Sequence, residues 1–153
     1  MYAKILVAID ESDTSLHALE HAIELARKLS ASVRMIHVLD MSWLPLGPEI
    51  AIDTAALSEA RRSAGERIIA SARDAARQAG FDAEAVLVET ETPIQQVAEA
   101  LTREASRWGA DLVVLGTHGR RGFQHLMLGS VAEQMVRRSP GPVLLIPSPK
   151  GPP

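Results

Sequence analysis

The sequence predicts an α/β fold, a three-layer sandwich in which a parallel five-stranded sheet carries helices on both faces. Two observations support this prediction. Five short apolar runs are spaced along the chain, and four stretches between them repeat apolar residues at helical spacing with charged residues in between. Strands that alternate with helices are typical of parallel sheets, because each helix returns the chain to the edge where the next strand begins.

Length and composition narrow the class of protein. The 153 residues predict one domain over residues 1–147 and a disordered tail over 148–153, which is rich in proline and glycine. The net charge of −3 argues against a general nucleic-acid binder, which needs a basic excess. Cysteine is absent, which excludes disulfides, thiolate metal ligands and a thiol nucleophile. The first apolar run is too short for a signal sequence or a membrane span, so we expect a cytoplasmic protein that does not associate with membranes.

The first half of the chain predicts a strand, a helix, a second strand and a loop. Residues 5–9 are nearly all apolar, which favours a central strand buried on both faces. Polar residues 12–14 offer N-caps for an amphipathic helix that runs to residue 29. Residues 33–39 form the second strand. Prolines and a glycine then predict a long loop over residues 41–57, a length at which loops often serve function.

The second half predicts two further helix and strand pairs before the last helix and strand. A helix over residues 58–79 ends at Gly80, and a strand follows at 83–88. Thr92 as N-cap, Pro93 as first helical residue and Gln95 completing a capping box predict the start of a helix that ends at Gly109. The remaining elements are a strand at 112–115, a helix at 130–138 and a strand at Val143–Ile146 between two prolines.

The stretch from residue 112 to 131 carries the clearest chemical signal. Its apolar strand is followed by Gly116, Gly119, Gly129 and Ser130 in the pattern G-x2-G-x9-G-S. Glycine permits positive φ and lets a ligand approach the backbone closely. Gly129 and Ser130 precede a helix, whose free N–H groups and positive dipole end attract anions. The pattern therefore predicts a phosphate-binding loop.

Three segments together resemble the nucleotide-binding branch of the universal stress protein family: KILVAID, MIHVLD and GTHGRRGFQHLMLGSVAEQMVRRSPGPVLLIP. The resemblance runs from Lys4 to Pro147. It implies a Rossmann-like sheet of strand order 3-2-1-4-5 and an adenine nucleotide, ATP with or without Mg²⁺, as ligand. In that order the first and fourth strands are neighbours, so Asp10 and Gly116 would flank the crevice where the strand order reverses.

The resemblance also implies contacts for individual residues. Ala8 and the carboxylate of Asp10 would lie near adenine and ribose, and Val38 would meet the base through its main chain. Ala8 stands where some relatives have proline, a departure of little consequence for a backbone contact. The residues around the ribose and phosphates would be Leu115, Gly116, Gly119, Gly129, Ser130 and Val131. The chain has no Walker A sequence, and we predict neither a catalytic residue nor a metal ligand.

Several residues near the motif keep two interpretations. Asp10 either contacts the nucleotide or only caps the first helix. Arg120 and Arg121 either neutralise phosphates or form a solvated loop face, and the same choice applies to His118 and His125. The blander view of the whole motif is a turn followed by a glycine and an N-cap serine.

Two further features point less clearly to a function. His17 and His21 are four residues apart on the first helix, but the glutamate lies before the second histidine rather than after the first, and no third ligand is evident. Trp43 and its apolar neighbours form a lid or partner surface, or else pack on the next helix; the sequence does not separate these.

The leading expectation is an ATP-binding stress-response protein that acts as a nucleotide-dependent switch or partner-binding module. One alternative is a slow Mg²⁺-dependent ATPase or phosphotransferase assisted by Asp10 or Ser130. Another is a dimeric scaffold that binds AMP, cyclic AMP or no nucleotide. The apolar last strand, Val143–Ile146, would be an edge strand in the implied order, and the resemblance implies a homodimer through it.

Overall fold

The computed structural model describes residues 1–41, 54–91, 96–118 and 128–149. Five strands alternate with four helices in this part of the chain. In order they are β1 (Lys4–Ala8), α1 (Asp13–Leu29), β2 (Ser32–Leu39), α2 (Thr54–Gln78), β3 (Glu84–Glu89), α3 (Val97–Trp108), β4 (Leu112–Gly116), α4 (Ser130–Arg138) and β5 (Val143–Ile146).

The five strands form one parallel sheet in the order β3-β2-β1-β4-β5. This confirms the predicted strand order, and it makes β3 and β5 the two edges. The central strand β1 is the most protected, since Ile5, Leu6 and Val7 are wholly buried. Its position explains its unbroken apolar run, because a strand covered on both faces has no solvent side.

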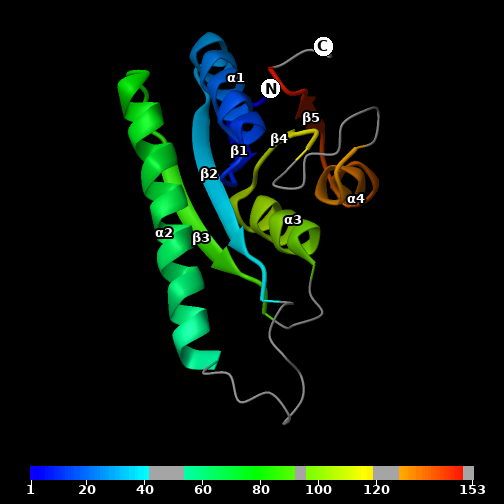
Figure 1. Cartoon of the computed structure of the whole chain (residues 1–153). Helices are drawn as coiled ribbons and strands as arrows, with labels where there is room; N and C mark the ends of the chain where they lie inside the picture. The colour runs from blue at the N-terminus through cyan, green and yellow to red at the C-terminus, as the bar shows by residue number, and fades with distance from the viewer. Residues whose placement is uncertain (42–53, 92–95, 119–127, 150–153) are drawn as a thin grey trace.

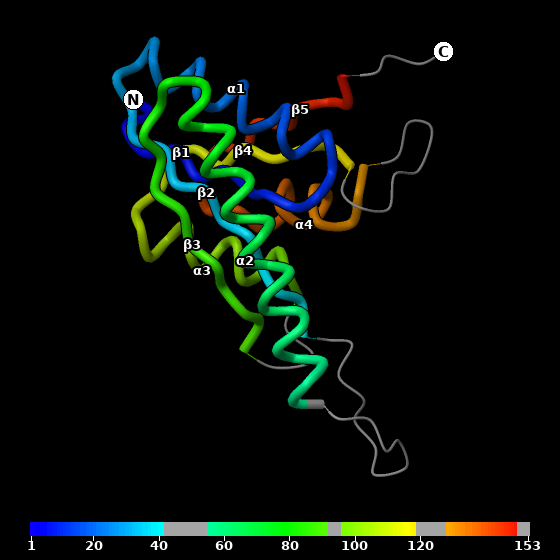
Figure 2. Tube along the Cα trace, turned by 60° about the vertical axis from the view of Figure 1, so that its left-hand side comes forward, coloured from blue at the N-terminus to red at the C-terminus, as the bar shows by residue number. Residues whose placement is uncertain are grey.

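Helices cover both faces of the sheet (Figure 1). Alternate residues of a strand point to opposite faces, so Ile5 and Val7 pack with α1 while Leu6 packs against α3 and α4. Figure 2 shows α2 running along the β2 and β3 side of the sheet. Leu101 of α3 and Met135 of α4 close the second face. The three predicted layers are present.

The predicted start of α2 was wrong by four residues. The helix begins at Thr54 rather than at residue 58, so residues 54–57 belong to it and not to the preceding loop. The breakers that defined the loop end at Pro48, and the alanines that follow favour helix. Residues 42–53, including Trp43, lie outside the described residues.

The predicted start of α3 was also wrong. The helix begins at Val97, its N-cap is Gln96, and no side chain caps it. Thr92, Pro93 and Gln95 lie outside the described residues. The start of this helix coincides with the residues that pack on the sheet, Ala98 and Leu101, which are buried. Packing, rather than a local capping motif, therefore accounts for where α3 begins.

Two predicted helix ends are confirmed. Gly80, just beyond α2, and Gly109, just beyond α3, have φ of +70° and +74°. This is the left-handed region, where glycine lacks the penalty that a Cβ imposes on other residues. The Gly109 amide donates to Ala105 and Ser106 carbonyls and closes the last turn of α3.

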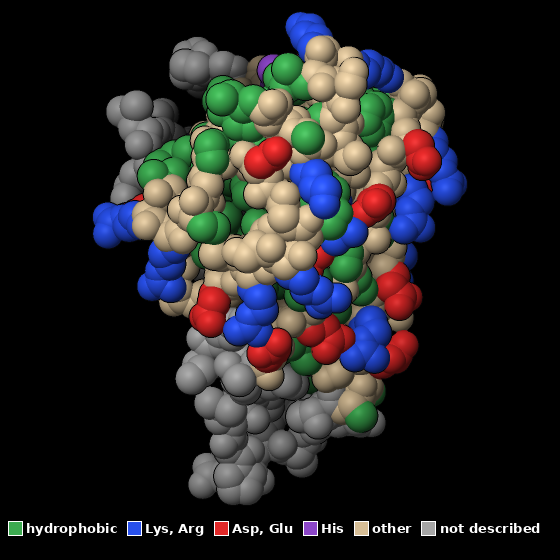
Figure 3. Space-filling model, turned by 180° about the vertical axis from the view of Figure 1, so that it is seen from behind, with side chains coloured by type: hydrophobic (Ala, Val, Ile, Leu, Met, Phe, Trp, Pro, Cys, Tyr) green, Lys and Arg blue, Asp and Glu red, His purple; other side chains and the backbone are tan. Residues whose placement is uncertain are grey.

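Charges of both signs are interspersed on the face seen in Figure 3, without a large area of one sign. Exposed ion pairs of this kind include Arg62 with Glu89 and Arg103 with Glu91. The hydrogen bond and charge of Arg103 lower the pKa of Glu91. Such pairs contribute little stability each, because water screens them. None of the helices in the described part of the chain has both the length and the apolar content needed to span a bilayer.

Candidate functional site

The strand order reverses between β1 and β4. The chain leaves β1 toward β2 on one side and leaves β4 toward β5 on the other, so the connections diverge beyond the carboxyl ends of these two strands. Their register pairs Val7 with Val114, which brings Ala8 and Leu115 to the same edge of the sheet. In open parallel sheets this is the place where ligands bind.

The turn after β1 is held by a network around Asp10. One carboxylate oxygen, Oδ1, accepts hydrogen bonds from the Ser12 amide at 2.7 Å and from the Ser12 hydroxyl. Ser12 is the N-cap of α1, and its Oγ accepts from the Ser15 amide at 3.2 Å. Asp10 thus braces the cap without being the cap itself. Its other oxygen, Oδ2, forms no hydrogen bond with the described residues.

A second buried serine ties the same turn to the backbone. The Ser15 hydroxyl lies 2.9 Å from the Asp10 carbonyl and 3.0 Å from the Ser12 carbonyl, and it accepts the Asp10 amide at 3.2 Å. Ser15 is buried. The backbone of Asp10 is therefore fixed on both sides, while half of its carboxylate stays uncommitted.

The end of β4 packs directly against α1. A Cβ built on Gly116 would lie 2.5 Å from Cγ2 of Thr14, which is closer than carbon atoms approach. Gly116 is the last residue of β4, and its φ lies outside the left-handed region. Close packing against Thr14, rather than an unusual φ, accounts for glycine at this position.

The start of α4 is joined to the same end of β4. The Thr117 amide donates to the Ile146 carbonyl at 2.9 Å, and the Thr117 carbonyl accepts from the Gly129 amide at 2.7 Å. These two bonds hold β5, the end of β4 and the N-cap of α4 together. Gly129 comes 13 positions after Gly116 in the sequence, but its amide donates a hydrogen bond to Thr117, the residue that directly follows β4.

Among the described residues, no side chain caps the N-terminus of α4. Gly129 is the N-cap, with φ −59° and ψ 156°, and glycine has no side chain that could accept a hydrogen bond. Glu133 is the first residue whose amide bonds back, to the Gly129 carbonyl at 3.0 Å. The amides of Ser130, Val131 and Ala132 therefore have no acceptor within the helix. Ser130 itself is exposed and is the first helical residue, so its interpretation as an N-cap serine was wrong.

The end of β2 presents main-chain groups to the crevice. The Ile36 carbonyl accepts from the Ile9 amide at 2.7 Å, so Ile36 bonds toward β1. By the two-residue alternation of a strand, the main-chain groups of Val38 face the same way. There they meet no β1 partner among the described residues, because β1 has ended; the Ile9 carbonyl instead accepts a hydrogen bond from Nδ1–H of His37 at 2.7 Å.

The structure brings most of the predicted site residues to one edge of the sheet: Ala8, Asp10, Val38, Leu115, Gly116, Gly129, Ser130 and Val131. Gly119, Arg120, Arg121 and His125 lie outside the described residues, and their roles stay predictions. His118 is described and contacts Thr117. The rings of His17 and His21 pack edge to face with their centroids 4.6 Å apart, and Oε2 of Glu20 lies 3.4 Å from Nδ1 of His17. Within the described ranges, no three metal-ligating side chains gather into a group that could hold an ion.

Sequence reasoning missed four residues that shape this edge: Thr14, Ser15, His37 and Thr117. Thr14 was considered only as a cap, and its contact with Gly116 joins residues far apart in sequence. His37 is a buried polar residue inside an apolar strand. That anomaly was visible in the sequence, because a buried polar side chain needs a partner.

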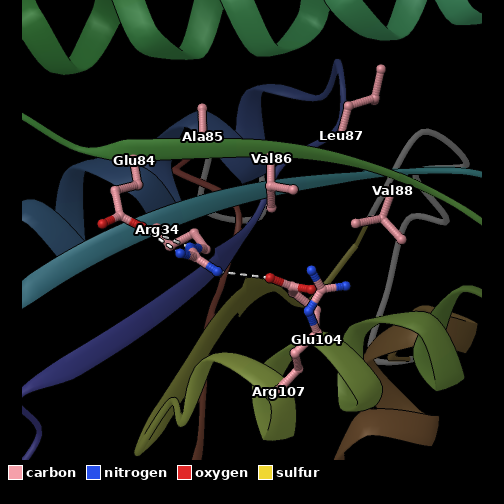
Figure 4. Close-up of a pocket in the computed structure, with 8 residues that line it drawn as sticks. All are labelled: Arg34, Glu84, Ala85, Val86, Leu87, Val88, Glu104 and Arg107. Carbon is pink, nitrogen blue, oxygen red and sulfur yellow. Dashed lines mark hydrogen bonds and ion pairs between the residues drawn. The ribbon is translucent and has the colours of Figure 1, made fainter.

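A separate hollow of about 550 Å³ lies between β3 and α3 (Figure 4). Val86 and Val88 point into it from β3. Its charges are largely paired, since Arg34 binds Glu84 at 2.6 Å and the buried Glu104 at 2.9 Å. Arg34 also stacks on the ring of Trp108 at 4.6 Å. These ion pairs connect α3 to β2 and β3, away from the strand reversal. We therefore assign these ion pairs a structural role.

The polar groups at the strand reversal suit the different parts of a nucleotide. Open amides at the start of α4 suit phosphate oxygens, free main-chain groups of Val38 suit the edge of a base, and the uncommitted Oδ2 of Asp10 suits a ribose hydroxyl. This edge of the sheet is polar at the start of α4, where phosphate would lie, and apolar at the buried Leu115.

Comparisons with known proteins identify the family of this chain. The universal stress protein family model matches residues 1–147. A universal stress protein of Methanocaldococcus jannaschii is 33% identical over 151 residues, covering 98% of this chain and 85% of that protein. A crystal structure from the same family in Burkholderia pseudomallei is 38% identical with a TM-score of 0.77, covering 95% of this chain and 96% of that one.

A universal stress protein solved in complex with cAMP is 27% identical, with a TM-score of 0.66, and covers 96% of this chain and 98% of that one. Its ligand is an adenine nucleotide. The family model and the solved structures therefore agree on family and fold over nearly the whole chain. The chain belongs to the universal stress protein family.

Proposed function

We propose that this protein binds an adenine nucleotide, ATP in the first instance, across the carboxyl ends of β1 and β4, and that the bound nucleotide switches its interaction with a partner protein. The observation that carries the proposal is the open N-terminus of α4, which a hydrogen bond from Gly129 to Thr117 holds against the end of β4. The cAMP complex of a 27% identical relative supports an adenine nucleotide as the ligand class.

Each predicted site residue has a part in this proposal. The base lies against the main chain of Val38 and near Ala8, and the ribose lies near Asp10 and Leu115. The phosphates lie over the glycines and the first turn of α4: Gly116, Gly119, Gly129, Ser130 and Val131. Uncapped amides are suitable phosphate donors because they lose no internal hydrogen bond when an anion arrives.

Thermal unfolding of nucleotide-stripped protein tests this proposal. The panel is ATP, ADP, AMP, cyclic AMP and GTP, each with and without Mg²⁺. A ligand at 100 times its Kd adds about 2.7 kcal/mol to the free energy of unfolding, and each kcal/mol raises Tm by about 2–4 °C in a domain of this size. We expect ATP to raise Tm by several degrees. No shift with any adenine nucleotide at millimolar concentration would contradict the proposal and favour the scaffold alternative.

A slow Mg²⁺-dependent ATPase is the alternative chemistry. Hydrolysis needs a group that positions water or removes its proton, and Asp10 is a carboxylate just beyond the end of β1. Its Oδ1 is already committed to Ser12. This favours a binding role over a catalytic one. Phosphate release that requires Mg²⁺ and disappears in Asp10→Ala, but survives in Asp13→Ala, would instead support the ATPase.

The edge strand β5 supports a second part of the proposal, a homodimer. Leu144 is 36% exposed on this strand, and Val136 of the adjoining α4 is 55% exposed. Leu145 faces the opposite way, toward the core of α3 and α4, so its substitution would disturb the fold as well as a dimer. We therefore choose Leu144→Asp. Sedimentation of the wild type as a dimer and of this variant as a folded monomer is the expected result, and a monomeric wild type at micromolar concentration would contradict it. The cytoplasmic location stays a prediction of the sequence.

A further inference from the structure

The hollow between β3 and α3 has the size and the lining of a small-molecule site (Figure 4). Its volume of about 550 Å³ lies within the range of about 300–1,000 Å³ that such sites span. Val86 and Val88 form an apolar wall, because alternate residues of β3 point to the face of the sheet that α3 covers. Both valines are only half-buried, so this wall is open to a ligand.

Glu104 lines the hollow from α3 with one half of its carboxylate unpaired. The residue is only 6% exposed. Its Oε1 accepts a hydrogen bond from Arg34 at 2.9 Å, whereas its Oε2 forms none with the described residues. Removing a carboxylate from water is costly unless its lone pairs find donors. The free oxygen of Glu104 is therefore suited to a donor that a ligand brings.

Arg34 cannot supply that donor as well. Its Nε and one terminal nitrogen donate to Oε2 of Glu84 at 2.8 and 2.6 Å, and its other terminal nitrogen donates to Glu104. Its guanidinium also lies 4.6 Å from the ring centroid of Trp108, a cation–π contact that holds it in this orientation. One positive charge is thus shared between two carboxylates, which leaves this end of the hollow with an excess negative charge.

Arg107 carries the opposite charge at the rim of the hollow. It follows Glu104 by three residues on α3, so the two side chains are neighbours on the helix surface. Arg107 is exposed and forms no hydrogen bond or ion pair with the described residues. A guanidinium with free N–H groups binds a carboxylate through two parallel hydrogen bonds. The hollow therefore offers an unpaired acceptor and an unpaired cation side by side, opposite an apolar wall.

We propose that this hollow binds a zwitterionic α-amino acid with an aliphatic side chain. The ammonium group donates to Oε2 of Glu104 and the carboxylate accepts from Arg107, which suits two ligand charges carried on one carbon atom. The aliphatic side chain lies against the two valines of β3. An amine alone would leave Arg107 without a partner, and a carboxylate alone would leave Oε2 without a donor. The site is separate from the strand reversal, because β2 lies between β3 and β1.

NMR titration of the full chain with leucine and three analogues tests this proposal. The analogues are 3-methylbutylamine, which lacks the carboxylate, 4-methylpentanoate, which lacks the ammonium group, and glycine, which lacks the aliphatic side chain. We expect leucine to bind with a Kd of about 1 mM or below and to shift the backbone signals of Val86 and Val88. Each analogue should bind at least about ten-fold more weakly, the size of one lost contact to a charged group or of one lost apolar side chain.

Arg107→Gln removes the guanidinium without disturbing the core, because Arg107 is exposed. Arg103→Gln is the matched control, since Arg103 is exposed on the same helix but pairs with Glu91 and Glu99 and does not line the hollow. We expect leucine to bind Arg107→Gln about ten-fold more weakly than the wild type. Leucine should bind Arg103→Gln as it binds the wild type, and 3-methylbutylamine should bind Arg107→Gln no more weakly than the wild type.

Three results would overturn this inference. The first is unchanged signals of Val86 and Val88 with leucine at about 10 mM, ten times the highest expected Kd. The second is equal affinity for leucine and 3-methylbutylamine, and the third is unchanged leucine affinity in Arg107→Gln. Either of the last two would mean that the ligand carboxylate makes no contact in the hollow. The proposed nucleotide site would stand after each of these results, because it involves other residues.

Discussion

Two helices begin at the same edge of the sheet, and they treat their first amides in opposite ways. At the start of α1, Ser12 caps the helix and Asp10 braces the cap. At the start of α4, the N-cap is Gly129, and no side chain of the described residues caps the helix. Both ends contact β4, through Thr14 and Gly116 in one case and through Gly129 and Thr117 in the other.

The difference separates a helix end that stabilises the fold from a helix end that is available to a ligand. A capped end satisfies its own donors and gains about 0.5–2 kcal/mol over an alanine cap. An open end leaves its donors for water in the free protein and for an anion in a complex. The same structural element, a helix following a parallel strand, therefore serves the fold at α1 and, under our proposal, the ligand at α4.

Closing the open end is the strongest way to break this comparison. Gly129→Asp introduces a carboxylate that can cap the helix. The backbone of residue 129 has φ −59° and ψ 156°, a conformation that aspartate adopts readily as an N-cap. We expect ATP affinity to fall by at least about 100-fold, because the carboxylate occupies the amides and repels phosphate, and like charges placed together cost several kcal/mol. Stability should not fall, since aspartate caps better than glycine by a few tenths of a kcal/mol.

Calorimetry with ATP and thermal unfolding without it measure these two effects. Gly141→Asp is the matched control, because a Cβ there meets nothing within 4 Å and the change in net charge is the same. Unchanged ATP affinity in Gly129→Asp would show that phosphate does not lie at the start of α4. A lower Tm in this variant would show that Gly129 serves the fold, which is the opposite of what the comparison implies.

Substitution at the contact between Gly116 and Thr14 should have an effect of intermediate size, on the free energy of unfolding. Gly116→Ala places a Cβ 2.5 Å from Cγ2 and 3.2 Å from Cβ of Thr14. We expect the free energy of unfolding to fall by about 1–3 kcal/mol, the usual cost of overpacking. Thr14→Ser removes Cγ2, so the double variant should recover part of that loss. Denaturant midpoints of the wild type, both single variants and the double variant measure the coupling, and strictly additive effects would refute the contact.

The sequence predicted the fold well because its signals are local. Apolar runs located all five strands to within a residue at each end, and positive φ at Gly80 and Gly109 explains two helix ends. The order of the strands came from the family resemblance rather than from the runs themselves. The start of α3 was wrong because a capping motif is a local preference, whereas the observed start at Val97 coincides with residues that pack on the sheet.

The candidate site was only partly predictable, because its contacts are long-range. The glycines of the motif were visible, but the reason for two of them was not. Gly116 faces Thr14, a residue of another element, and Gly129 adopts a φ that needs no glycine. Nor did the sequence reveal that Nδ1–H of His37 donates to the Ile9 carbonyl, or that β1 ends before it can pair with the main chain of Val38. Such facts depend on which strands are neighbours, which short patterns do not encode.

The smallest expected effect comes from opening the closed end. Ser12→Ala removes the hydroxyl that caps α1 and one of the two donors to Oδ1 of Asp10, while the Ser12 amide stays, so the free energy of unfolding should fall by about 1 kcal/mol. ATP affinity should change less than about three-fold, a shift worth about 0.6 kcal/mol, because Ser12 is not among the proposed phosphate contacts. Ser12→Thr keeps a capping hydroxyl and should match the wild type in both measurements. A loss of ATP affinity in Ser12→Ala as large as in Gly129→Asp would mean that the start of α1 also binds phosphate. Both helix ends would then bind phosphate, and the contrast between a structural end and a binding end would no longer hold.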